Sequence, residues 1–172
     1  MKKLLLLLAL LPFAAVAGEA PDGPGRVLSN ALLDHLVGSW ALSGPILGQS
    51  AELTLTAEWV LNHQFLHIHE KARSAAAGQV TYEAEVYIGY DNASDRYVAH
   101  WIDVYGGRFS ETLGYGPRTE DRVALVFEYP DGPFHNTMTW NTGSGTWHVQ
   151  MEQKGPDGKW HMFADQTAVR NK

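Results

Sequence analysis

Hydrophobic and polar residues alternate along most of the chain, and the pattern is clearest between residues 80 and 103. In the first half of this stretch, apolar side chains take every second position: Tyr82, Ala84, Val86 and Ile88. A period of two is that of a β-strand with one buried and one solvent-exposed face. The polar run at 91–95 then predicts a turn, because Asp, Asn and Ser side chains bond to nearby backbone groups. Alternation resumes from residue 96, so the stretch predicts a β-hairpin.

The same pattern recurs between turns that are rich in Gly, Pro, Asn and Asp. We expect about ten strands. They are Ser39–Ser43, Ala51–Val60, Gln64–Ala72, Val80–Tyr90, Asp95–Asp103, Phe109–Tyr115, Arg122–Tyr129, Phe134–Asn141, Gly145–Lys154 and Lys159–Val169. Short connections favour antiparallel neighbours, and closure of a long meander removes exposed edges. The sequence therefore predicts an all-β fold, a closed antiparallel up-and-down β-barrel.

One segment has a helical period instead. Apolar residues recur at helical spacing between residues 26 and 37, which predicts one short amphipathic N-terminal helix that ends at Gly38. A Gly- and Pro-rich leader and this helix together occupy residues 18–36, and the barrel occupies 37–170. A single folded domain is expected, because 172 residues suit one domain.

The first seventeen residues form a separate segment. Two lysines precede an apolar block at 4–11, and Ala15-Val16-Ala17 offers the small residues that a signal peptidase reads. The block is too short to span a bilayer, which takes ~20 residues. We therefore expect a signal peptide at residues 1–17, cleavage near Ala17, and a soluble periplasmic or secreted protein without a membrane anchor.

Composition narrows the classes of partner. The formal net charge of -6 and the lack of a basic run argue against nucleic acid and anionic lipid. The chain has no cysteine, so neither a disulfide framework nor a thiolate metal site is expected. A barrel of about ten strands is wider than its side chains need fill, so a small molecule is the expected partner.

Alternation assigns one face of each strand to the barrel interior. The inner positions are mostly apolar, and several carry tryptophan, including Trp101 and Trp147. On the last strand the pattern puts Trp160 and Met162 inside and His161 outside. Large aromatic rings serve both core packing and ligand pockets, so these positions are compatible with either.

Polar residues on the apolar faces are the candidate ligand-binding groups, because a buried polar group needs a partner. The alternation is ambiguous at 64–71, where His67 and His69 point inward if Phe65 does. Glu111 interrupts the apolar face of an expected strand. The full set of candidates is His67, His69, Tyr82, Trp101, Asp103, Glu111, Asn136, Trp147 and Gln166.

The same residues support an enzymatic alternative. His67 and His69 are two positions apart on a strand, so they could share a metal ion, with Asp103, Glu111 or His100 as a third ligand. Inward His, Asp and Glu would also suit acid–base chemistry. A metal-dependent or acid–base hydrolase or isomerase therefore stands beside the binding protein as a hypothesis. A purely structural or protein-interaction role for the barrel is a further reading.

Two parts of the chain resemble known barrels. Leu36-Val37-Gly38-Ser39-Trp40 is similar to the Gly-x-Trp signature of lipocalins. The run Gly89-Tyr90-Asp91-Asn92, with Tyr97-Val98 and Trp101-Ile102-Asp103 after it, resembles the bacterial lipocalin-like family of unknown function DUF1579. The turn at 155–159 also matches, whereas residues 62–66 depart from the family's Gly-Gly-Arg-Phe-Leu.

The resemblance covers residues 36–170, almost the whole expected mature chain. It implies a calycin-type closed barrel of the fatty-acid-binding or nitrobindin kind. It supplies neither a catalytic residue nor a ligand. A nitrobindin-like barrel would bind haem, with His67 or His69 as the axial ligand.

Overall fold

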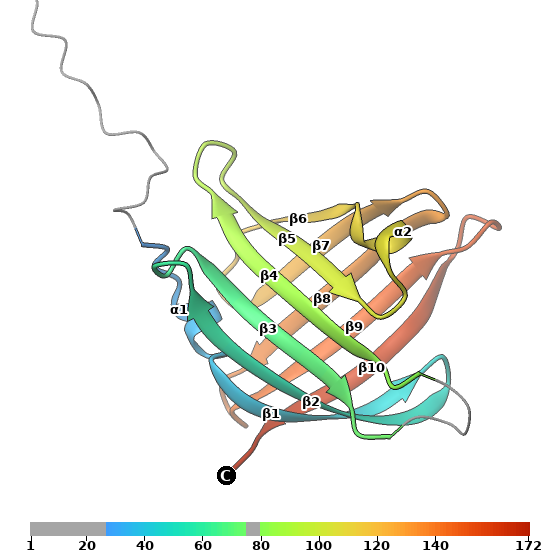
Figure 1. The fold of residues 1–172 in the computed structure, drawn as a ribbon, viewed down its shortest axis with the longest axis horizontal. Helices are drawn as coiled ribbons and strands as arrows, with labels where there is room; N and C mark the ends of the chain where they lie inside the picture. The colour runs from blue at the N-terminus through green and yellow to red at the C-terminus, as the bar shows by residue number, and fades with distance from the viewer. Residues whose placement is uncertain (1–26, 75–79) are drawn as a thin grey trace, which may run out of the picture.

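The computed structural model describes residues 27–74 and 80–172, and its ten antiparallel strands close into one barrel (Figure 1). The ring order is β1-β10-β9-β8-β7-β6-β5-β4-β3-β2, so each strand lies beside its neighbours in sequence and β1 closes the ring against β10. The predicted all-β, up-and-down closed barrel is confirmed. The expected signal peptide lies outside the described residues.

Two short helices accompany the strands. The elements are α1 (Ala31–Asp34), β1 (Gly38–Ile46), β2 (Gln49–Val60), β3 (Phe65–Ala72), β4 (Glu83–Asp91), β5 (Arg96–Asp103), α2 (Gly107–Ser110), β6 (Leu113–Pro117), β7 (Arg122–Tyr129), β8 (Gly132–Asn141), β9 (Thr146–Lys154) and β10 (Trp160–Arg170). Within the described ranges, neither helix is long and apolar enough to cross a membrane.

Helix α1 closes one end of the barrel. Leu32, Leu33 and Leu36 are buried there, with Leu33 at 0% exposure. The side-chain oxygen of Asn30 accepts hydrogen bonds from the backbone N–H groups of Leu32 and Leu33, which caps the helix. The Asn30 amide also donates to the hydroxyl of Tyr97 on β5 at 2.6 Å. The helix is therefore fixed to the wall, and we call this the closed end.

The helix is shorter than the sequence predicts. It spans only Ala31–Asp34, because the residues before it run beside the β2–β3 turn. The Leu28 N–H donates to the His63 carbonyl at 2.9 Å, and the Leu28 carbonyl lies 2.8 Å from Nδ1 of the same histidine. The apolar residues of this segment are therefore buried at the end of the barrel, although most of the segment is not helical.

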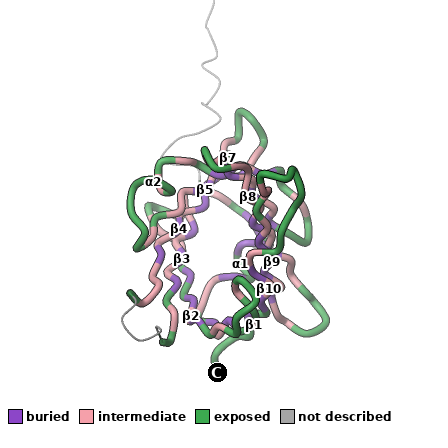
Figure 2. The backbone as a smooth tube through the Cα atoms, turned by 90° about the vertical axis from the view of Figure 1, so that its right-hand side faces the viewer, coloured by how far each residue is buried: buried purple, intermediate pink, exposed green. Residues whose placement is uncertain are grey.

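The opposite end, which we call the open end, carries α2 and the connections β1–β2, β3–β4, β7–β8 and β9–β10. In Figure 2 the strands form a ring, with α2 beside β4 and β5. Many inner positions are small: Ala57, Ala84, Ala99, Gly114, Gly116, Ala164 and Ala168. Since side chains just fill a barrel of about eight strands, small residues in a wider one favour an interior with spare volume.

The predicted strand at 109–115 is wrong in its first half. Gly107–Ser110 form α2 instead, and β6 begins at Leu113. Gly106 has a φ of 84°, which turns the chain out of β5, and the Ser110 hydroxyl bonds to the Gly106 carbonyl at 3.1 Å. Glu111 is the exposed residue that ends this helical turn, so it lies off the inner wall.

The inward placement of Trp160 and Met162 is also wrong. The β9–β10 register shifts between Met162 and Ala164, and a one-residue bulge reverses the faces of the residues before it. Trp160 therefore lies on the outer wall, where its ring stacks on His135 with centroids 3.8 Å apart.

Candidate functional site

The structure resolves the ambiguity on β3 in favour of outward histidines. His67 pairs in register with Glu58 and Tyr87, and His69 pairs with Thr56 and Glu85. Directly opposed residues share a face, and these partners alternate with the buried residues of β2 and β4. The inward option for both histidines is thus excluded, because the leucine–isoleucine face of β3 is the buried one.

The outward histidines contact carboxylates of β4. His69 Nε2 lies 2.7 Å from Glu83 Oε1, and His67 Nε2 contacts Glu85. Lys71 Nζ donates to Glu83 at 3.0 Å. Hydrogen bonds from His69 and then Lys71 hold the pKa of the Glu83 carboxyl below its usual range. These contacts lie on the outer wall and do not reach the lumen.

On the inner face of β3 the sequence places a carboxylate instead. Glu70 is 6% exposed, and it pairs in register with Leu55 on β2 and Ala84 on β4. Ala84 pairs in turn with Asp103 on β5, so Glu70, Ala84 and Asp103 form one inner row near the open end. Burial raises the pKa of Glu70 to about 7, and the neighbouring His69 lowers it less strongly.

Glu70 is the site residue that the sequence analysis missed. The sequence feature that could have revealed Glu70 is its position, because it shares the parity of the apolar residues Leu66 and Ile68. The alternation at 64–71 did not decide which face of β3 is buried, so the histidines of the other face were the candidates instead. In the described part of the chain, no group hydrogen-bonds to the Glu70 carboxyl.

Tyr82 and Trp101 lie beside this row. The Trp101 indole N–H donates to the Tyr82 hydroxyl at 3.1 Å, and the two rings come from adjacent strand ends. Burial, then the charge of Glu70, raises the pKa of Tyr82 far above its ordinary value, and Asp103 adds to the shift. The predicted residues Tyr82, Trp101 and Asp103 are thus brought together at the open end, with Glu70 as their neighbour.

The charge of Asp103 also affects a tyrosine on β7. Burial raises the pKa of Tyr129 on β7 to about 12, and the charge of Asp103 contributes to that shift. Asp103 accepts a hydrogen bond from the Tyr105 backbone N–H at 2.9 Å, which fixes its carboxyl at the end of β5. Tyr129 packs against Phe109 of α2 with ring centroids 5.9 Å apart. The open end is therefore lined by carboxylates and aromatic rings.

Asn136 and Gln166 are buried polar residues on the inner wall. They are 1% and 3% exposed, and among described groups neither Asn136 Oδ1 nor Gln166 Nε2 has a hydrogen-bond partner. Asn136 pairs with Leu125 and Met151, and β8 lies five places from β3 in the ring, so Asn136 faces Glu70 from the opposite wall.

The remaining candidate, Trp147, lies apart from this group. It is fully buried at the closed end, where its ring lies 5.3 Å from that of Trp140. Trp147 is therefore a core residue of the closed end in this structure. The site that the geometry assembles consists of Glu70, Tyr82, Trp101 and Asp103 near the opening, with Asn136 and Gln166 on the far wall.

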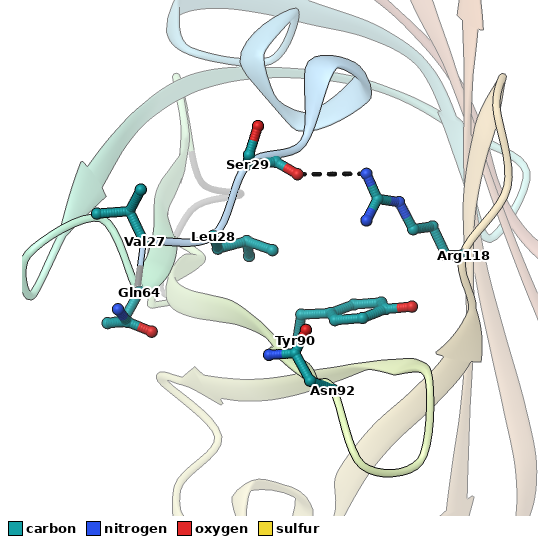
Figure 3. Close-up of a pocket in the computed structure, with 7 residues that line it drawn as sticks. All are labelled: Val27, Leu28, Ser29, Gln64, Tyr90, Asn92 and Arg118. Carbon is teal, nitrogen blue, oxygen red and sulfur yellow. Dashed lines mark hydrogen bonds between the residues drawn. The ribbon is translucent and has the colours of Figure 1, made fainter. Parts of the chain in front are cut away.

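Two cavities open at the ends of the barrel. One of about 260 Å³ lies at the closed end between the segment 27–29 and the residues Gln64, Tyr90, Asn92 and Arg118 (Figure 3). Arg118 donates to the Ser29 carbonyl there at 3.2 Å, so this cavity is bridged by the N-terminal segment. The other, a shallow open depression of about 280 Å³, lies over the ends of β4 and β5 and is lined by Glu83, Ala84, Glu85, Ile102, Asp103 and Val104.

Comparison with known proteins identifies the family. The model of a protein family of unknown function, DUF1579, matches residues 29–170, which span α1 and all ten strands. The chain belongs to DUF1579. The resemblance to DUF1579 that the sequence predicts is therefore confirmed. No significant match to a curated protein is found.

The DUF1579 family carries no assigned activity, so the chemistry of this member rests on its own residues. In the described ranges of this DUF1579 chain, no three His, Asp or Glu side chains are grouped so that they could hold a metal ion. His67 and His69 face solvent on the outer wall, and Glu111 lies beyond β5 on α2. Of the predicted third ligands, Asp103 lies on the inner wall and Glu111 follows α2 in the loop. His100 shares the outer face with His67, but its Nε2 lies 2.6 Å from the Ser110 carbonyl oxygen.

Proposed function

We propose that this DUF1579 protein binds a small, partly apolar molecule in the barrel, which the molecule enters from the open end. One observation carries the proposal: Asn136 Oδ1 and Gln166 Nε2 are buried on the inner wall without a partner in the described chain. A buried polar atom without a hydrogen bond costs about 1–3 kcal/mol. A bound molecule that bonds to these atoms would remove that cost.

The surroundings of these atoms favour an apolar body for the molecule. Leu125, Met138, Val149 and Met151 are buried beside them on β7, β8 and β9. Ligand sites are mostly apolar, with a few polar groups that fix orientation, and this wall has that composition. Trp101 and Tyr82 supply large rings nearer the opening.

The enzyme and haem alternatives lose their main residues. The haem alternative needed His67 or His69 inside the barrel, and the enzyme alternative used both histidines together with Asp103 and Glu111. Both histidine side chains lie on the outer wall, and Glu111 lies in the loop after α2. An axial haem ligand or a lumenal metal ligand must reach the interior, which these two histidines do not. Binding without chemistry is therefore the function that the geometry favours.

Export is part of the proposal. The apolar block and the small residues at 15–17 support a signal peptide, and a binding protein outside the cytoplasm would meet its ligand there. The mass of the mature protein from its own host tests this point. Loss of the first seventeen residues is expected, and an intact N-terminus would contradict export.

The binding proposal is tested with the neutral dye N-phenylnaphthylamine, whose fluorescence rises in apolar sites. The wild-type protein is expected to bind the dye, whereas Ala84→Phe is expected to weaken binding at least about tenfold, since the added ring would project into the interior beside Glu70. Val169→Phe is the matched control, because Val169 is 51% exposed and alternates with the inward Ala168. Equal dye binding by all three proteins would refute a lumenal site.

A further inference from the structure

The open end has carboxylates on its inner wall. Glu70 and Asp103 stand on either side of Ala84 in one inner row. Adjacent strands lie about 4.8 Å apart, so the backbones of Glu70 and Asp103 are separated by about 10 Å. In this row only the methyl group of Ala84 stands between them.

Cations are lacking from the same wall. Along the described strand faces that line the open end, no lysine or arginine points inward. The basic side chains nearest the open end are engaged elsewhere: Lys71 with Glu83, Arg73 with Glu52, Arg108 with Asp131, and Lys154 with the ring of Trp160.

The inner wall near the opening presents hydrogen-bond acceptors. Glu70 is more than nine-tenths buried and receives no hydrogen bond from described residues, and Asn136 Oδ1 on the opposite wall is an unpartnered acceptor. The unpartnered buried donors of the described inner wall are Gln166 Nε2 and, toward the closed end, Trp140 Nε1 and Trp147 Nε1. A carboxylate ligand would meet two like charges here, whereas a donor with a positive charge would satisfy both acceptors.

The aromatic rings at the opening fit the same class of molecule. Trp101 and Tyr82 lie beside the carboxylates, and Tyr129 faces Asp103 from β7. Aromatic faces attract cations and also pack against apolar groups. Both properties suit a molecule with a charged head and an apolar body.

We propose that the barrel selects an organic cation, a small molecule with a protonated amine between Glu70 and Asp103 and an apolar body along the inner wall. This inference rests on the proposed lumenal binding and adds the charge of the ligand. It separates this barrel from one that takes fatty acids, whose carboxylate head needs a cation on the wall.

Three probes that differ only in the head group test the inference. Octylamine, octanol and octanoate are each titrated into the mature protein at about pH 8, with tryptophan fluorescence or calorimetry as the readout. Octylamine is expected to bind at least about tenfold more tightly than octanol, because a buried charge pair contributes more than a neutral contact. Octanoate is expected to bind more weakly than octanol, since the two carboxylates repel it.

Two variants test whether Glu70 and Asp103 cause the preference for octylamine. Glu70→Gln is expected to lose most of the preference for octylamine over octanol while it keeps octanol binding, which also shows that the variant is folded. Asp103→Asn is expected to lower the preference in part. His67→Ala serves as the control, because it removes a polar side chain from the outer wall of the same strand as Glu70 and should leave all three affinities unchanged.

The outcomes separate the two proposals. Binding of all three probes with equal affinity, or tightest binding of octanoate, would overturn the inference and leave lumenal binding intact. A preference for octylamine that survives both Glu70→Gln and Asp103→Asn would overturn it as well. Failure of octanol and N-phenylnaphthylamine to bind at all would instead reject the proposed function on which it rests.

Discussion

His69 and Glu70 are consecutive residues of β3 whose side chains lie on opposite faces of the barrel wall. His69 bonds to Glu83 on the outer wall, whereas Glu70 is 6% exposed in the row of Ala84 and Asp103. A shift of one position would have put the histidine in the lumen and the carboxylate in solvent. The chemistry of the interior therefore depends on which face of this one strand is buried.

The buried carboxyl makes stability depend on pH. The pKa of Glu70 is raised from 4.5 to about 7 by burial, so the folded protein keeps a proton that the unfolded chain releases. Below 4.5 both states are protonated and nothing is lost. Stability then falls as pH rises through about 7, by on the order of 3 kcal/mol in total.

Glu70→Gln is expected to remove this dependence. An amide stays neutral, so the variant should become more stable than the wild type above about pH 7, with the difference growing between about pH 5 and pH 8. Urea denaturation of both proteins at the two pH values measures the difference, and the other ionisable groups cancel. A difference that does not change with pH would contradict the burial of the ionisable group.

The outer-wall histidine pairs are expected to contribute little. The side chain of His69 is 33% exposed and that of Glu83 is 39% exposed, so solvent screens their interaction. We expect His67→Ala and His69→Ala to change the free energy of unfolding by about 1 kcal/mol or less. Dye binding should also be unchanged in both. A loss of several kcal/mol, or of dye binding, would show that these histidines have a role inside the barrel.

The contact between Asn30 and Tyr97 is expected to stabilise the closed end. Asn30→Ala removes the cap of α1 and leaves the buried tyrosine hydroxyl without its donor, at a cost of about 2–3 kcal/mol. Tyr97→Phe removes one partner and should cost less. In a double-mutant cycle by chemical denaturation, the double variant should lose less than the sum of the two single losses. Strict additivity would mean that the two side chains do not interact.

Close packing at Gly116 provides a test of the barrel wall. A Cβ atom there would lie 1.7 Å from the Ala124 carbonyl oxygen, so β6 and β7 would have to separate. We expect Gly116→Ala to destabilise the fold by about 1–3 kcal/mol or more. Gly107→Ala is the matched control, because nothing lies within 4 Å of the added atom. Thermal unfolding should separate the two variants, and similar melting temperatures would contradict this packing.

Local sequence patterns were sufficient to predict the strands and their closure. Alternation and turn chemistry are short-range signals, so β4, β5 and the turn between them follow directly from residues 80–103. The local patterns gave wrong predictions where the structure departs from a regular alternation. The bulge before Ala164 reversed the faces of Trp160 and Met162, and the glycines at 106 and 107 replaced part of a strand with α2.

The site was predictable in part for a related reason. Tyr82, Trp101 and Asp103 follow from the strand period, and the structure brings them together. On β3 both faces carry polar residues, so the period alone did not decide between His67 and Glu70. Contacts with β2 and β4 decide it, because they place the apolar positions of all three strands on one side. Such long-range pairing is absent from the local sequence.

The indole N–H resonances of the six tryptophans give the most direct test of lumenal binding. The protein is titrated with N-phenylnaphthylamine and followed by NMR, with Trp101→Phe and Trp160→Phe used to assign the two signals. The Trp101 signal should shift on binding, because that indole lies at the open end beside Tyr82. The Trp160 signal on the outer wall should stay in place. A shift of Trp160 with Trp101 unchanged would contradict a ligand site inside the barrel.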